Sequence, residues 1–391
     1  MDYYKLCDVC DFQGGTQPPK DEWSFELKNG YIRMLQIRDF TQSEKTVPEY
    51  IKITNATKIC DKDDILIARY GASLGKILTG LSGAYNVAIM KTIPNTEKLN
   101  KKYLYYYLKS PVFQRFLLNV GSRAAQAGFN KNDLKDLLIP NVSKKQQERI
   151  VEILVRIERV ISLRKQQLAK LDELVKARFV EMFGDPISNP KGLPVKTLKQ
   201  LSTLITNGNT PKGGSENYVD EGILFLRSQN VWRNRIELED VAYIDEATHR
   251  SLKKSSLKYK DILITKTGRI NTENSSLGRA ALFLGEDNSA NINGHVYLIR
   301  LNGSVIPEYV ISILTSESYR NYIRKVCVGG IDKRQINLDQ VEEFPIIIPA
   351  IELQNQFAAF VKQVDKSKVA VQKALDEAQT LFGSLMQQYF G

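Results

Sequence analysis

The feature that most constrains the fold of this chain is an internal duplication. The segment Asp64–Gly71 (DILIARYG) returns 197 positions later as Asp261–Gly268 (DILITKTG). Ser73–Lys76 (SLGK) then returns as Ser276–Arg279 (SLGR), 203 positions later, so the second copy has gained six residues near Arg269–Asn274. A duplicated sequence with conserved order predicts two copies of one structural unit.

Three further pairs extend the duplication to the end of the chain. Tyr103-Leu104 matches Tyr309-Val310, Ile139-Pro140 matches Ile348-Pro349, and Phe183-Gly184 matches Phe390-Gly391. Order and spacing hold across all of them, which chance explains poorly. The 391 residues therefore divide into two halves of similar organisation.

Each copy begins with a part that mixes short β-branched and aromatic runs with Gly, Pro and Asn. We predict strands and helices from periodicity and turn residues. The predicted strands are Ile65–Ile67, Val87–Met90, Ile262–Ile264 and His295–Ile299, and the predicted helices are Lys101–Leu118 and Pro307–Val326. The pattern indicates a globular α+β unit of roughly 150 residues, within the usual size of a domain.

Each copy ends in a long helix with a heptad seam, whose positions step by four and three alternately and are apolar at eight of ten places in copy one and nine of ten in copy two. The seam of copy one is Ile150, Leu154, Ile157, Ile161, Arg164, Leu168, Leu171, Val175, Arg178 and Met182. That of copy two is Phe357, Val361, Val364, Lys368, Val371, Leu375, Ala378, Phe382, Leu385 and Tyr389. One alternative is that each helix packs on one side onto a globular core. Two matched helices in one chain favour an intramolecular coiled coil.

The segment Asp185–Pro194 separates the two copies, because three prolines and a glycine in ten residues end a helix. The predicted order is a globular domain at 1–142, a spacer helix at 143–184, a linker and second globular domain at 185–350, and a second spacer helix at 351–391. If the second helix folds back antiparallel along the first, a pseudo-twofold relates the two globular domains. The predicted fold class is α+β, with two globular domains alternating with two long antiparallel helices.

Composition and charge narrow the function. The chain has 55 Lys and Arg against 44 Asp and Glu, a formal net charge of +11. Such a balance is typical of proteins that meet nucleic-acid phosphates, although basic enzymes without that role also have it. No apolar run approaches the roughly 20 residues that cross a bilayer, and no secretory signal is visible at the start. We therefore expect a cytoplasmic protein without a membrane partner.

The sequence contains few of the motifs that form catalytic or metal sites. Cys7 and Cys10 form C-x-x-C, which could supply half a zinc site, but a second ligand pair is missing, so reduced, partly buried thiols are favoured. Gly71–Ile77 resembles a phosphate loop but lacks one residue between its glycines and the Ser/Thr that binds magnesium. No Rossmann fingerprint, methyltransferase tetrapeptide or acidic cluster is present. We predict a non-catalytic chain with no metal site and no cofactor of its own.

Polar loop residues at matching places in both copies are the candidates for a functional site. Arg and Lys suit guanine, Asn and Gln suit adenine, and all four can instead hold phosphates. Each taken alone is also compatible with an ordinary solvated loop. The candidates in copy one are Thr16, Gln17, Gln36, Arg38, Arg69, Lys76, Ser122, Arg123 and Gln126. Those in copy two are Asn209, Thr210, Lys212, Arg227, Gln229, Asn230, Lys266, Arg269, Asn271, Arg279, Lys333, Arg334 and Gln335.

These features resemble the specificity (S) subunits of type I restriction-modification systems, over essentially the whole chain. The resemblance rests on the duplicated DILI…G…SLGK/R element, the segment Gly329–Asn337 (GGIDKRQIN), the Ile-Pro before each long helix and the Phe-Gly after it. Copy one departs from the pattern, because Gly121–Gln126 (GSRAAQ) stands where copy two has Gly329–Arg334.

The resemblance implies that the two globular domains are target-recognition domains, each reading half of a split, asymmetric sequence in double-stranded DNA. It also implies two methyltransferase subunits that bind S-adenosylmethionine, and endonuclease subunits that use ATP and Mg²⁺, in a system of DNA methylation and phage defence. The alternative function is a catalytic DNA enzyme, a methyltransferase or a nuclease, with an unrecognised active site.

Overall fold

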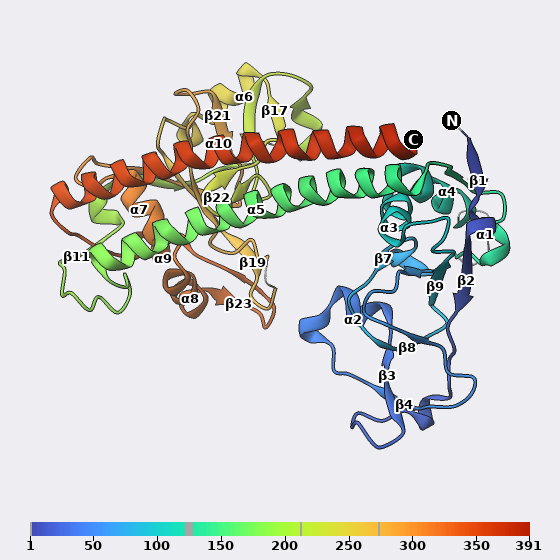
Figure 1. The fold of residues 1–391 in the computed structure, drawn as a ribbon. Helices are drawn as coiled ribbons and strands as arrows, with labels where there is room; N and C mark the ends of the chain where they lie inside the picture. Colours follow the sequence, from blue (N-terminus) through green and yellow to red (C-terminus); the bar gives the residue numbers. More distant parts are fainter. Residues whose placement is uncertain (1, 122–127, 212, 273) are drawn as a thin grey trace. The chain divides into compact units, whose positions relative to one another are not determined.

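The computed structural model describes residues 2–121, 128–211, 213–272 and 274–391. The chain divides into two compact units, residues 1–165 with 372–391 and residues 166–371. Each unit contains one globular domain and a part of both long helices, α5 (Lys144–Phe183) and α10 (Ile351–Phe390) (Figure 1). Within the described ranges, no helix is both long and apolar enough to span a membrane.

The first globular domain is built on two four-stranded sheets. One has the order β2 (Cys10–Gly14), β9 (Ile89–Pro94), β6 (Leu66–Ala68), β7 (Ile77–Leu78). The other has the order β4 (Tyr50–Lys52), β3 (Tyr31–Leu35), β8 (Gly83–Tyr85), β5 (Ile59–Cys60), while β1 (Tyr3–Lys5) pairs with β10 (Leu138–Pro140). The α-helices are α1 (Leu6–Val9), α2 (Ile37–Thr41), α3 (Lys101–Lys109) and α4 (Pro111–Gly121).

The second globular domain repeats this plan. Its sheets have the orders β12 (Ser202–Asn207), β22 (Val296–Leu301), β18 (Ile262–Thr265), β20 (Ala280–Leu282), and β13 (Tyr218–Val219), β17 (Ala242–Ile244), β14 (Ile223–Leu226), β21 (Ala290–Ile292). The pair β11 (Val195–Thr197) and β25 (Pro345–Ile347) corresponds to β1 and β10, and the α-helices are α6 (Glu246–Ser251), α7 (Pro307–Leu314), α8 (Glu317–Val326) and α9 (Leu338–Glu342). The second domain also contains the pair β15 (Val231–Trp232) and β16 (Arg235–Ile236), and a small sheet of order β19 (Thr267–Arg269), β24 (Lys333–Gln335), β23 (Val328–Gly329).

Strand direction confirms that the domains are copies of one fold. In each domain the second sheet contains one parallel pair, β3 with β8 and β14 with β21, beside antiparallel neighbours. The repeated DILI segments form β6 and β18, each paired on both sides within the first sheet of its domain. The duplicated sequence thus produces a duplicated topology.

The two predicted internal helices differ from the structure, since each is a pair of shorter helices. The predicted helix at 101–118 breaks between α3 and α4, where Ser110 precedes Pro111 and proline disfavours helical backbone in the residue before it. The predicted helix at 307–326 breaks between α7 and α8, where the Ser316 side chain accepts a hydrogen bond from the Tyr319 backbone and starts a new helix. Periodicity alone predicted neither the break before Pro111 nor the cap at Ser316.

The heptad seam of the long helices is confirmed, because every seam position of both helices is buried or half-buried. In the first unit, Ile150 and Leu154 from the start of α5 share a core with Met386 and Phe390 from the end of α10. In the second unit, Phe179 near the end of α5 contacts Phe357 near the start of α10, with 5.5 Å between ring centroids. The start of each helix therefore meets the end of the other, which makes the pair antiparallel.

Candidate nucleic-acid interface

In copy one, the segment that follows β3 brings two candidates onto one carboxylate. Gln36 caps α2, and its Nε2 donates to Oε2 of Glu49 at 2.6 Å. Arg38, an exposed residue on α2, also donates to Glu49, as does Lys20 at 3.3 Å. Glu49 itself is 8% exposed. Three donors, two of them cationic, compensate the cost of burying its carboxylate.

In copy two, the segment that follows β14 forms a similar cluster. Arg227 donates from Nη2 to the Asp240 carbonyl oxygen at 2.7 Å and to its carboxylate at 3.1 Å. Gln229, which is exposed, donates to the same carboxylate. The candidates after the two equivalent strands therefore share a local arrangement.

Two candidates of copy two have structural contacts that occupy their polar groups. Asn230 is 2% exposed, and its Nδ2 donates to the carbonyl oxygens of Glu237 and Asp240 at 3.0 and 2.9 Å. Arg279 is 8% exposed, donates from Nε to the Ser275 carbonyl oxygen at 3.0 Å, and stacks 3.8 Å from the ring centroid of Trp232. Burial lowers the pKa of the Arg279 guanidinium, with nearby Arg233 adding to the effect. We leave both residues out of the proposed DNA surface.

The small sheet β19-β24-β23 gathers candidates that are far apart in the sequence. Arg269 lies opposite Lys333 across β19 and β24, and Arg334 lies opposite Gly329 across β24 and β23. Lys333 is exposed and Arg334 is half-buried. The Arg269 guanidinium is 3.3 Å from the Asp332 carboxylate. This sheet and its turns form a cationic hairpin surface, defined here as residues 266–271 and 328–335.

Other members of the cationic hairpin surface face different partners. The Lys266 ammonium lies 5.7 Å from the ring centroid of Tyr297, and Gln335 donates to the Asn337 side chain at 3.0 Å. Asn271 is exposed in the turn after β19. Ile331, which sequence reasoning did not select, is 90% exposed at the turn between β23 and β24. An apolar residue so exposed among cations is a further candidate contact.

The matching region of copy one is only partly described. Tyr70 forms a bridge with Gly128, at the place where Thr267 pairs with Gln335 in copy two. Arg69 is anchored there, with Nε donating to the Phe129 carbonyl oxygen and Nη1 to that of Val87, both at 3.1 Å. Lys76 is exposed. The candidates Ser122, Arg123 and Gln126 lie outside the described residues, as does Lys212 of copy two.

The remaining candidates follow two equivalent glycines at the ends of β2 and β12. A Cβ on Gly15 would lie 2.2 Å from the Asn86 carbonyl oxygen, and one on Gly208 would lie 1.9 Å from that of Ile292. Only glycine lets the backbone pass so closely over the neighbouring sheet. Thr16 and Gln17 follow the glycine in copy one, and Asn209 and Thr210 follow it in copy two. All four are exposed except Thr16, which is half-buried.

Three of the four cysteines are buried and the fourth, Cys7, is half-buried. All four cysteines are free, and burial raises the pKa of the Cys10 thiol to about 12 and that of Cys60 to about 11. Over the ranges that the structure describes, no group of three or more His, Cys, Asp and Glu could hold a metal ion.

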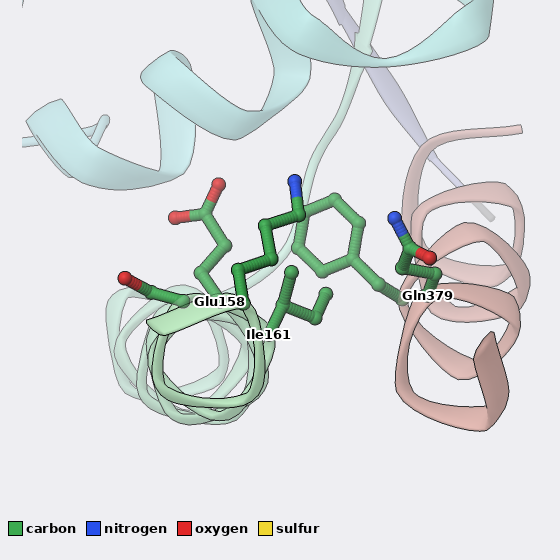
Figure 2. A pocket seen from close by; sticks show the side chains of 6 residues that line it. Glu158, Ile161 and Gln379 are labelled. Carbon is green, nitrogen blue, oxygen red and sulfur yellow. The ribbon is translucent and has the colours of Figure 1, made fainter. Parts of the chain in front are cut away.

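A shallow hollow in the first unit lies between the two long helices. It is lined by Glu158, Ile161, Ser162, Lys165, Gln379 and Phe382. Figure 2 shows Glu158 and Ile161 on α5 with Gln379 on α10 across from them. Glu158 accepts hydrogen bonds from the Tyr106 hydroxyl at 2.7 Å and the Lys109 ammonium at 2.8 Å. Its carboxylate thus ties α5 to α3, which is a structural role.

Comparison with known proteins identifies relatives along the whole chain. A family model described as the type I restriction modification DNA specificity domain matches residues 1–173 and 190–378, one range in each copy. The type I restriction enzyme MjaVIII specificity subunit of Methanocaldococcus jannaschii is 22% identical over 364 residues, which are 88% of this chain and 82% of the relative.

Two solved structures share the fold. The crystal structure of a type I restriction-modification S subunit from M. genitalium superposes with a TM-score of 0.57 at 15% identity, covering 100% of this chain and 96% of that one. A chain from a study of assembly and conformational transition of the type I R-M system gives a TM-score of 0.60 at 17% identity, covering 100% and 97%.

Proposed function

The chain belongs to the type I restriction-modification DNA specificity family, and we propose that it reads a bipartite, asymmetric target in double-stranded DNA, one half-site with each globular domain. A specificity subunit is the non-catalytic part of a type I restriction-modification enzyme. The alternative drawn from sequence, a catalytic DNA methyltransferase or nuclease, is therefore set aside.

The observation that carries the proposal is that equivalent strands in the two domains lead into equivalent polar segments with different side chains. Gln36 and Arg38 follow β3, whereas Arg227 and Gln229 follow β14. Equal frameworks provide two reading surfaces of the same kind, and unequal side chains give them different base preferences. Two different half-sites make a target that is not palindromic.

The DNA-contacting residues that we propose are the candidates that are exposed or half-buried in the structure. In the first domain they are Thr16, Gln17, Gln36, Arg38, Arg69 and Lys76, and in the second Asn209, Thr210, Arg227, Gln229 and the cationic hairpin surface. The formal net charge of +11 supports contact with the phosphate backbone.

We further propose that the chain assembles with two methyltransferase subunits and with endonuclease subunits. The relative from Methanocaldococcus jannaschii is named as the specificity subunit of a restriction enzyme, which supports such a complex. In this arrangement S-adenosylmethionine binds the methyltransferase partner, and ATP with Mg²⁺ binds the endonuclease partner.

The test is to sequence methylated bases in cells that carry the whole system, with and without this gene. We expect methylation of a split, asymmetric motif that disappears when the gene is deleted. A motif that survives the deletion would contradict a role in specificity. Transfer of labelled methyl groups to DNA by the purified chain alone would instead restore the catalytic alternative.

A further inference from the structure

Glu49 and Asp240 occupy equivalent positions in the two globular domains. Residues 36–49 and 227–240 are aligned without a gap, each pair 191 positions apart. Each segment begins directly after the strand that forms the parallel pair of its second sheet, β3 or β14.

The backbone confirms this equivalence at the start of the two segments. The Gln36 backbone nitrogen donates to the Asp39 carboxylate at 2.8 Å, and that of Arg227 donates to the Asn230 side chain at 2.9 Å. Asp39 and Asn230 are likewise 191 positions apart, and each is 2% exposed. The same local turn is thus built twice.

Each carboxylate holds one amide and one guanidinium, and the order of the two is reversed between the domains. Glu49 accepts from Gln36 at the first position and Arg38 at the third. Asp240 accepts from Arg227 at the first position. It accepts from Gln229 at the third. We call these pairs with their carboxylates the first and second clamps.

Resting on the proposed function, we infer that Glu49 and Asp240 are positioning residues that aim the Gln–Arg pairs at base edges. Gln and Arg are long side chains that lose rotamer freedom on binding, so fixing them beforehand removes part of that cost. The carboxylate also repels phosphate groups, so it disfavours binding of the Gln–Arg pair to the DNA backbone. Base edges are then the favoured partners of the pair. The clamps therefore contribute to selectivity rather than to affinity alone.

The two clamps differ in how tightly their carboxylates are held. Glu49 is 8% exposed and has a third donor in Lys20, whereas the Asp240 side chain is 78% exposed. An exposed ion pair is weakened by solvent. We therefore expect substitution of Glu49 to change selectivity more than substitution of Asp240.

The experiment selects binding sites from duplexes with randomised half-sites, using the full chain in complex with its methyltransferase subunits. Glu49→Gln should relax base preference at positions of one half-site by about 5- to 150-fold, the range of one bidentate base contact. Asp240→Asn should relax the other half-site, by less. Affinity for DNA of unrelated sequence should stay equal or rise, because a negative charge has been removed near the phosphates.

Matched controls separate positioning from a general charge or folding effect. Glu239 is the exposed neighbour of Asp240 in the sequence. Glu239→Gln removes one negative charge there and should leave every base preference unchanged. Asp240→Glu, which keeps the charged carboxylate, should retain most of the selectivity that Asp240→Asn loses. Because the Asp240 side chain is exposed, these variants test the idea even if Glu49→Gln does not fold.

Unchanged base preferences in both carboxylate variants would overturn the inference, as would equal loss of cognate and unrelated binding. Failure of the proposed function has a different signature, since the wild-type complex would then select no sequence at all.

Discussion

The ring of Phe390, at the end of α10, packs against the ring of Tyr103 on α3 with 5.1 Å between centroids. Phe183, 207 positions earlier, contacts the equivalent Tyr309 on α7, with 5.0 Å between ring centroids. The end of each long helix thus completes the core of the globular domain that belongs to the other copy. This reciprocal packing explains why each compact unit takes residues from both helices.

The first prediction concerns this packing. Phe390→Ala should lower the free energy of unfolding of the first unit by about 3–5 kcal/mol, because it removes a ring that is 4% exposed. Chemical denaturation followed by hydrogen exchange would locate the loss in residues 1–165 and 372–391. The control is Leu381→Ala on the same helix, where the side chain is 51% exposed and the change should stay within about 0.5 kcal/mol.

A second prediction treats the antiparallel helices as a ruler for the spacing of the half-sites. Asp172 and Lys368 form an ion pair at 2.5 Å, which gives the register of the two helices in the second unit. Leu168 and Gln372 are each four positions from this ion pair along their own helices, so insertions at these two places lengthen both helices equally. One heptad inserted in both should lengthen the helices by roughly 10 Å, or about three base pairs of DNA.

Sequencing of methylated bases would check the ruler. The non-specific spacer should lengthen while both half-site sequences stay the same. A heptad inserted in only one helix is the control, because it breaks the register and should destabilise the protein. An unchanged spacer in the double insertion would refute the ruler.

A third prediction concerns the order of the amide and the guanidinium in the first clamp. The double substitution Gln36→Arg with Arg38→Gln gives the first domain the order found at Arg227 and Gln229. Since amides suit adenine and guanidinium groups suit guanine, the two corresponding base preferences should change places in one half-site. Each single substitution should change the preference at one of the two base positions and leave the other unchanged. Retention of the original half-site by the double variant would show that this pair does not read bases.

Much of the fold could be predicted from the sequence, because its signals are local. Heptad steps and repeated segments such as Asp64–Gly71 depend only on neighbours along the chain, and both long helices end within a residue of the Phe-Gly pairs. The breaks at Ser110 and Ser316 were missed because one residue, Pro111 at the first break and the capping Ser316 at the second, outweighed the periodicity on either side.

The candidate DNA-contacting residues were harder to predict from the sequence, because their environments depend on contacts between residues far apart in the chain. Asn230 and Gln229 are adjacent and chemically alike, yet only the fold shows that the first is buried in a turn and the second exposed. Glu49 and Asp240 lie 13 and 11 positions beyond the side chains Gln36 and Gln229 that they hold. The constant separation of 191 positions was the signal that could have revealed both carboxylates.

The fourth prediction concerns Arg334 in the cationic hairpin surface. Its Nε donates to the Gly330 carbonyl oxygen at 3.2 Å, which orients the guanidinium on β24. If it reads guanine, Arg334→Ala should cost about 1–3 kcal/mol of binding and relax one position of the second half-site. Binding of the methyltransferase complex to cognate and single-base variant duplexes would measure both effects.

The last prediction concerns Lys333, which is exposed on β24 beside Arg334 and opposite Arg269. An ammonium group is a compact point charge that suits a phosphate better than a base edge. Lys333→Ala should therefore weaken binding to every sequence about equally and lower the slope of affinity against salt concentration by about one. The measurement is a salt titration of cognate and unrelated duplexes with the methyltransferase subunits present. Lys333 and Arg334 are adjacent on one strand. If Lys333→Ala weakens binding to all sequences and Arg334→Ala weakens binding only to the cognate sequence, then Lys333 contacts a phosphate and Arg334 contacts a base. Wild-type binding by both alanine variants would exclude the hairpin from the DNA interface.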